Sequence, residues 1–170
     1  MSQPFDPAPA AALLLAHWRS GTQFTELPTE IRPRNLNEGY DLQDLFVAET
    51  GEAVAGWKLG VGSPAAMRSA GLDRPLVGRL LASHCHRSGD TVQLPDAAPV
   101  TVEFEIAFIL GRDIAPNDLP AAPLDAVSST YVAFELVRSR FVDRRAVGWP
   151  SFAADNVGFE ASILGDAIDP

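Results

Sequence analysis

The stretch that decides the fold runs from Val100 to Gly111 and reads Val-Thr-Val-Glu-Phe-Glu-Ile-Ala-Phe-Ile-Leu-Gly. Its apolar residues alternate with other residues over most of its length, and this period of two predicts a half-buried β-strand rather than a helix. Successive side chains on a strand point to opposite faces. One face is therefore expected to carry Val100, Val102, Phe104, Ile106, Phe108 and Leu110, and the other Thr101, Glu103, Glu105 and Ala107.

Glu103 and Glu105 then lie side by side, about 6 to 7 Å apart at Cα, because a strand rises about 3.3 Å per residue. Carboxylate oxygens suit a hard divalent cation. The alternative is a solvated outer face of an antiparallel sheet, where glutamate is ordinary. Thr101 and Ala107 are small for an exposed face, and no Lys or Arg between Val100 and Leu110 balances the acids. A metal would supply that counter-charge if the face is enclosed.

Length and composition limit the kinds of protein that this chain can be. The 170 residues fit one domain, with 46% hydrophobic and 21% charged residues, which is typical of a globular chain. A net charge of -9 without basic runs argues against a nucleic-acid or anionic-membrane binder. The single cysteine, Cys85, excludes an internal disulfide framework. No apolar run is long enough to span a bilayer, and no basic leader is present, so the sequence favours a cytoplasmic protein.

Two helices are expected before the first strand. Residues 10–19 are strong helix formers, and Gly21 offers a stop. Asn35 with Glu38 resembles a capping box, which predicts a second helix to about Glu49 that ends at Gly51. Residues 53–61 then form a short apolar strand with Lys58 in its middle. A lysine there either extends its ammonium to water or serves a site that binds an anion.

Two short motifs suggest a dinucleotide-binding site and a zinc site, but the surrounding sequence supports neither. Residues 60–65, Gly-Val-Gly-Ser-Pro-Ala, match a dinucleotide fingerprint, but the helix capped by Ser63 is barely two turns long and no acidic residue follows at the required distance. His84-Cys85-His86 suggests zinc, yet no second Cys or His pair follows. Short strands are expected at 78–81 and 91–94, with an exposed loop at the His-Cys-His sequence between them.

A third acid is expected to join the two on the central strand. Residues 112–123 read as a loop and 124–129 as one helical turn. Residues 131–140 alternate again and place Glu135 among small and apolar neighbours, which makes it the natural third oxygen ligand. The chain then continues through Asp155 and a short apolar run at 161–164.

Six segments in order along the chain carry a resemblance to a known family. They are Gly39–Gln43 (GYDLQ), Gly56–Gly60 (GWKLG), Pro75–Gly78 (PLVG), Val102–Phe108 (VEFEIAF), Glu135–Arg140 (ELVRSR) and Ala154–Asn156 (ADN). This ordered set resembles the 2-keto-4-pentenoate hydratase branch of the fumarylacetoacetate hydrolase superfamily. The H-x-x-E signature of the hydrolase branch has no match, so the resemblance favours hydration or decarboxylation over C–C hydrolysis.

The resemblance implies a site and a reaction. Glu103, Glu105 and Glu135 fall on the acids that bind Mg²⁺ or Mn²⁺ in that family, and Lys58 falls on a lysine near the substrate. Tyr40, Ser139 and Asp155 are further candidates for positioning. The implied reaction is hydration of a 2-hydroxy-2,4-dienoate to a 4-hydroxy-2-oxo acid, a step of aromatic-compound catabolism. Decarboxylation of a 2-oxo-3-enedioate, as in related oxalocrotonate decarboxylases, and a non-catalytic partner subunit are the alternatives.

The expected fold is α+β, with N-terminal helices followed by a mixed, mainly antiparallel β-roll. Residues 1–34 are expected to form an arm and helix, and residues 35–170 an incomplete catalytic domain. Leu76 departs from the polar or acidic residue usual in the family. Family chains also continue further, so the sequence is expected to cover the N-terminal two-thirds of such an enzyme or to be a shortened paralogue. Unpaired sheet edges favour a homo-oligomer.

Overall fold

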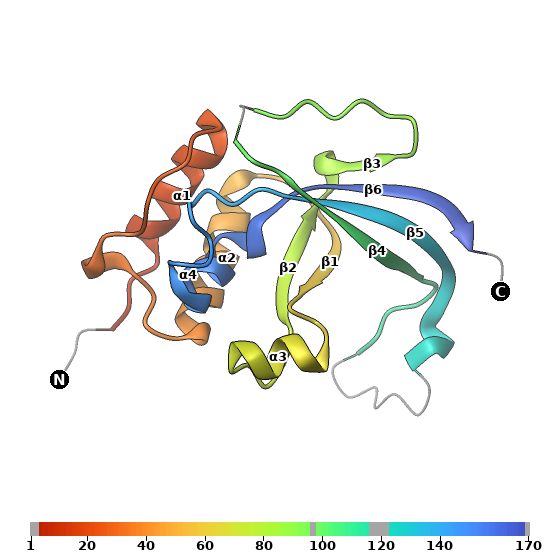
Figure 1. The fold of residues 1–170 in the computed structure, drawn as a ribbon, viewed down its shortest axis with the longest axis horizontal. Coiled ribbons are helices and arrows are strands. Elements are labelled where there is room, and N and C mark those ends of the chain that lie inside the picture. Colours follow the sequence, from red (N-terminus) through yellow and green to blue (C-terminus); the bar gives the residue numbers. More distant parts are fainter. Residues whose placement is uncertain (1–3, 96–97, 116–122, 169–170) are drawn as a thin grey trace.

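The fold is taken from a computed structural model, which describes residues 4–95, 98–115 and 123–168. Figure 1 shows most of the helices gathered at one end of a twisted sheet, a two-stranded hairpin along one face of that sheet, and a short helix at the end of the hairpin. The helices are α1 (Ala8–Ser20), α2 (Leu36–Thr50), α3 (Pro64–Ala70) and α4 (Gly148–Ala154). The strands are β1 (Val54–Gly60), β2 (Leu76–Leu81), β3 (Cys85–Arg87), β4 (Thr101–Leu110), β5 (Val127–Val137) and β6 (Phe159–Ile168).

The strands form two sheets. β1 and β2 pair as an antiparallel hairpin in which Lys58 lies opposite Gly78. The larger sheet has the order β3-β6-β5-β4, and only β3 and β6 run parallel. These sheets confirm a mixed, mainly antiparallel α+β fold. Completion of the sheet into a roll stays a prediction.

The helices begin and end where the sequence indicates. The Asn35 side chain accepts a hydrogen bond from the Glu38 backbone at 3.0 Å, which caps α2. Glu38 reaches back to the backbone of Arg34 rather than to Asn35, so the capping box is displaced by one residue. α1 packs against α2 through a shared buried core that includes Leu14, Leu42 and Phe46. The division at residue 34 stays a prediction.

The alternation of the central strand is confirmed, but its burial is the reverse of the usual pattern. The apolar side of β4 faces outward, and Phe104 is 79% exposed. Glu103 and Glu105 lie on the half-buried side, so the reading of these acids as a solvated outer face is wrong. β4 is also the edge strand of its sheet. The two carboxylates are therefore half-buried, while the apolar side of the strand is exposed.

Several local expectations are wrong. Residues 91–94 form no strand, and Cys85–Arg87 is not a loop but the short strand β3, which pairs with β6. β5 begins at Val127, four residues earlier than expected, because β4 offers it partners along its whole length. The helix α4 was not expected. The predicted loop at 112–123 falls partly outside the described residues, because 116–122 are not described.

None of the helices in the described parts of the chain combines the length and the apolar character that a membrane crossing requires.

Candidate metal centre

Three glutamates meet on the inner side of the sheet. Glu103 and Glu105 alternate on β4, and the register of β4 with β5 places Glu135 directly opposite Glu103. One carboxylate oxygen from each of the three lies within 4.8 Å of the others. Three converging carboxylates match the oxygen ligands that Mg²⁺, Mn²⁺ or Ca²⁺ takes in proteins. The donor set therefore fits a hard divalent cation.

A buried lysine faces the most enclosed of these acids. The Lys58 ammonium lies 2.5 Å from Oε1 of Glu135, and the two side chains are only 7% and 5% exposed. Lys58 also donates a hydrogen bond to the backbone carbonyl of Val157, at 3.1 Å. Of the two sequence-based readings of Lys58, exposure to water is thus excluded, and its ammonium belongs to the acid cluster.

Burial, together with neighbouring like charges, shifts two pKa values upward. Burial raises the pKa of Glu135 above its ordinary value of 4.5, Lys58 lowers it, and Glu103 and Glu105 raise it. Partial burial raises the pKa of Glu105, Glu103 adds to this rise, and Lys58 opposes it. Lys58 therefore does not fully offset burial and the neighbouring acids, so a proton or a metal ion would be stabilised here.

The metal-free protein is expected to lose stability as the pH rises through the folded-state pKa of Glu135. A carboxyl group whose pKa is raised by folding binds its proton more tightly in the folded state. Its stabilising contribution is therefore complete below the unfolded pKa and is lost above the folded pKa. With EDTA, the Tm of the wild type should fall more steeply than that of Glu135→Gln as the pH rises above 4.5, the ordinary pKa of the carboxyl group. Equal slopes would contradict this expectation.

Lys58 and Glu103 line a cavity of about 190 Å³. Its wall also contains Val61, Val137, Arg144, Arg145, Trp149 and Phe152. The Arg144 guanidinium lies 3.8 Å from Glu103 Oε1 and 5.8 Å from the centre of the Phe152 ring. Sequence reasoning missed this segment. The signal was the Arg144-Arg145 pair, two adjacent cations in a chain of net charge -9.

Ser139 and Asp155 are brought together, but away from this cavity. The Ser139 hydroxyl donates to Asp155 at 2.6 Å, and the Arg140 guanidinium pairs with the same carboxylate at 2.5 Å. All three side chains are buried. None of them lines the cavity that contains Lys58. Their contacts hold the end of β5 against the residues that follow α4, and a role in the reaction stays a prediction.

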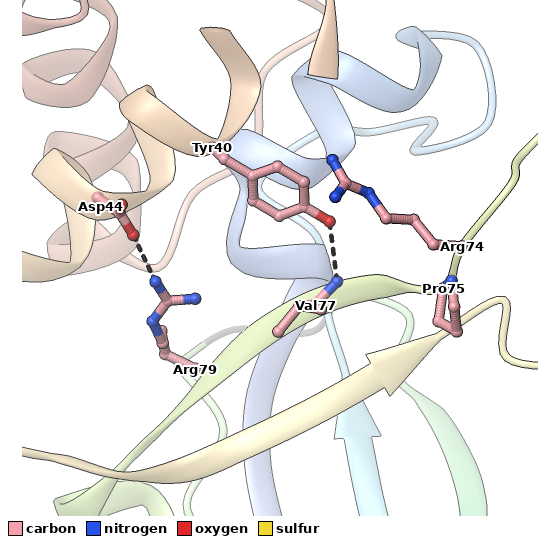
Figure 2. A pocket seen from close by; sticks show the side chains of 6 residues that line it. All are labelled: Tyr40, Asp44, Arg74, Pro75, Val77 and Arg79. Carbon is pink, nitrogen blue, oxygen red and sulfur yellow. Dashed lines mark hydrogen bonds and ion pairs between the residues drawn. The ribbon is translucent and has the colours of Figure 1, made fainter. Parts of the chain in front are cut away.

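Tyr40 lies in a different cavity. Figure 2 shows its ring pointing from α2 onto β2, where its hydroxyl accepts the Val77 N–H at 3.0 Å. This cavity, of about 240 Å³, is also lined by Arg74 and by the ion pair between Arg79 and Asp44. It contains none of the three glutamates and no part of Lys58. The structure therefore does not bring Tyr40 to the acid cluster.

The structure also explains why residues 60–65 are no dinucleotide-binding motif and why His84-Cys85-His86 is no zinc site. β1 and β2 are antiparallel, whereas a dinucleotide-binding unit needs parallel strands around its glycine turn. A ring nitrogen of His84 lies 2.7 Å from the Glu160 carbonyl, and Cys85 is exposed. In the described ranges, the three glutamates are the only group found that could hold a metal ion.

No protein-family model matches the chain. Curated relatives do. A TodF product hydratase of Pseudomonas putida F1 is 31% identical over 157 residues, which is 90% of this chain and 57% of the relative. A 2-keto-4-pentenoate hydratase of Burkholderia vietnamiensis is 35% identical over 68% of this chain and 44% of the relative. A 4-oxalocrotonate decarboxylase of a Pseudomonas species is 29% identical over 76% of this chain and 52% of its own.

A solved structure shares the fold. The 4-oxalocrotonate decarboxylase from Pseudomonas putida G7, complexed with magnesium and adipate, superposes with a TM-score of 0.81 at 19% identity. The superposition covers 96% of this chain and 65% of that one. The chain thus spans less than two thirds of the length of these relatives.

Proposed function

Because this chain belongs to the 2-keto-4-pentenoate hydratase branch of the fumarylacetoacetate hydrolase superfamily, we propose that it takes part in metal-dependent hydration of a 2-hydroxy-2,4-dienoate. The product would be a 4-hydroxy-2-oxo acid. The observation that carries this proposal is the convergence of three carboxylates, one of which pairs with a buried lysine. A scaffold has no physical need for such a cluster, since enclosing like charges costs free energy.

In this proposal Glu103, Glu105 and Glu135 hold Mg²⁺ or Mn²⁺. The bound ion would act as a Lewis acid toward the carboxylate and C2 oxygens of the substrate. The net reaction first moves a proton from the C2 hydroxyl to C5, which turns the dienol into a conjugated 2-oxo acid. Water then adds across the remaining double bond, with its hydroxyl group on C4 and its hydrogen on C3. These steps neither oxidise nor reduce the substrate overall.

The chain's own residues would bind the substrate and manage these protons. Lys58 would hold a substrate carboxylate or transfer a proton. Arg144 and Arg145 supply positive charge for an anionic substrate in an otherwise acidic protein. Trp149 and Phe152 give the cavity an apolar wall against which a diene can lie. Lys58 and Glu103 thus line a partly apolar space.

Loss of dienol ultraviolet absorbance tests the proposal directly. Purified protein is mixed with 2-hydroxypenta-2,4-dienoate in the presence of Mg²⁺ or of EDTA. The expected result is turnover with Mg²⁺ that EDTA abolishes and added Mg²⁺ restores. Metal binding without turnover would refute catalysis by these 170 residues alone. An absence of metal binding would refute the three-carboxylate assignment itself.

A decarboxylase of a 2-oxo-3-enedioate is the second candidate, and Arg145 is the observation that favours it. Arg145 is exposed at the same cavity as Lys58, where its guanidinium is available to a second carboxylate. A relative of this chain is named 4-oxalocrotonate decarboxylase. The two candidates differ in whether the substrate carries one carboxylate or two.

Replacing Arg145 with alanine distinguishes the two candidates. If the physiological substrate is a dicarboxylate, the KM for a 2-oxo-3-enedioate should rise about tenfold, as expected for a lost charge-assisted contact. For the monocarboxylate dienoate, the change in KM should be small. Arg68→Ala, which removes an exposed arginine from α3 outside the cavity, is the matched control. Equal effects of Arg145→Ala on both substrates would contradict a specific contact with the second carboxylate.

Self-association is also part of the proposal. β4 is an edge strand, and Val102, Phe104, Ile106 and Phe108 are exposed along it. Such an edge favours pairing with further polypeptide. The mass in solution, measured by light scattering, tests this, and a strictly monomeric protein would contradict it.

A further inference from the structure

The turn that follows α4 is strained. Asn156, Val157 and Gly158 have φ angles of 51°, 53° and 71°, so three successive residues adopt left-handed backbone conformations. Asparagine and glycine tolerate this region, but valine is β-branched and is rarely found there. Residues with such conformations persist only where their surroundings impose them, and they cluster at functional sites. Something therefore holds this turn in place.

The side chain of Asn156 provides that hold. Its Oδ1 accepts the Arg79 N–H at 2.6 Å, and its Nδ2 donates to the Arg79 carbonyl at 2.8 Å. The amide thus pairs with both backbone groups of one residue of β2, much as a neighbouring strand would. Asn156 is only 2% exposed, so loss of either bond would leave a buried polar group without its partner.

The turn at 156–158 directs the backbone carbonyl of Val157 toward Lys58 of the candidate site. The oxygen of Val157 accepts the hydrogen bond from Lys58. The backbones approach so closely that a Cβ on Gly78 would lie 2.8 Å from the Asn156 carbonyl and 2.9 Å from Cγ of Lys58. A Cβ on Gly60 would lie 2.7 Å from the Val157 side chain. The hairpin, the turn and the lysine stem therefore fit together without room for a shift.

We propose that Asn156 is a positioning residue for Lys58. By fixing the left-handed turn, it places the Val157 carbonyl where it orients the Lys58 ammonium toward Glu135 and the cavity. A lysine side chain has a flexible four-carbon stem, so its charge needs fixed acceptors to stay in one place. A neutral carbonyl supplies one such acceptor without cancelling the charge. This inference deepens the proposed function and rests on it for the catalytic use of Lys58.

The sequence offers an unusually clean measurement, because Lys58 is the only lysine in the chain. Selective ¹⁵N labelling of lysine gives one side-chain ammonium resonance. A small N-hydroxysuccinimide ester acylates only Lys58 and the N-terminal amine, which peptide mass mapping separates. The test variant is Asn156→Gly, since glycine keeps the left-handed backbone but removes both hydrogen bonds. Asn156→Asp keeps an acceptor oxygen, removes the donor and adds a negative charge.

Gln43→Leu is the matched control. Gln43 is also a buried amide, and it donates to the carbonyls of Val77 on β2 and Ala153 on α4. Its Oε1 also accepts a hydrogen bond from the Arg79 guanidinium at 3.1 Å. Its loss therefore removes comparable hydrogen bonds from the same part of the structure, but not the two that join the Asn156 amide to the Arg79 backbone. Any change that reflects only lower stability should therefore appear in this control as well.

For Asn156→Gly we expect a shifted Lys58 resonance and acylation about tenfold faster than in the wild type, as for local opening of a protected group. Asn156→Asp should also be acylated faster, although its added negative charge by itself favours the unreactive ammonium form, so its acylation rate decides the question if Asn156→Gly does not fold. Gln43→Leu should keep the wild-type resonance. An unchanged Lys58 in a folded Asn156 variant, or an equal change in Gln43→Leu, would overturn the inference. Absence of dienoate turnover in the wild type would instead refute the proposed function, because the lysine readouts need no substrate.

Discussion

Replacing Glu105 with glutamine should weaken Mg²⁺ binding by more than about 100-fold and remove metal-dependent turnover, since loss of a direct ligand costs more than loss of its supporting contacts. Glutamine keeps the length and shape of the side chain but removes its charge. Of the two acids on β4, Glu105 is the better choice. Arg144 lies beside Glu103, so a change there would also alter that arginine.

The same substitution should have the opposite effect on the metal-free protein. Burial raises the pKa of Glu105, and repulsion from Glu103 adds to this rise. Removing that charge relieves the repulsion, so the Tm measured in EDTA should increase. Titration calorimetry with Mg²⁺ and melting curves with and without EDTA measure the two effects.

Asp41→Asn is the matched control, because it removes one negative charge from an exposed position on α2. It should change neither Mg²⁺ affinity nor metal-dependent turnover. Equal Mg²⁺ affinity of Glu105→Gln and the wild type would exclude Glu105 as a ligand. A lower Tm in EDTA would contradict the inferred repulsion.

Replacing Lys58 with methionine should destabilise the metal-free protein by about 3 kcal/mol, because breaking a buried ion pair leaves one charge uncompensated. Lys58 and Glu135 are both almost fully enclosed, and Glu135 already faces two other acids. The free energy of unfolding in urea with EDTA measures the loss. Added Mg²⁺ should recover part of it, since the ion supplies the missing positive charge.

A double variant separates the ion pair from the packing of the lysine stem. Lys58→Met combined with Glu135→Gln removes both charges, so it should be more stable than Lys58→Met alone. Arg34→Met, which breaks the exposed ion pair with Glu38, should change the free energy of unfolding far less. If Lys58→Met costs no more than Arg34→Met, the pair at the site does not stabilise the fold.

The sequence by itself determined the local structure. Caps at Asn35 and Ser63 and glycines after each helix set the bounds of α2 and α3, because capping depends on residues three or four positions apart. Alternation in residues 100–110 determined that Glu103 and Glu105 share one face of β4, since that depends only on the period of a strand. The choice of Glu135 as the third acid followed in the same way.

Only the tertiary structure decided which residues pack against these faces of β4 and β5. Whether the acidic side of β4 lies inward depends on the packing of the β1–β2 hairpin, and the pairing of Lys58 with Glu135 depends on contacts between strands far apart in the sequence. The positions of Arg144 and Arg145 at the cavity also depend on the tertiary structure, as do the hydrogen bonds between the Asn156 side chain and the Arg79 backbone. Such contacts are set by register and burial across the whole chain, and no periodicity within one segment records them.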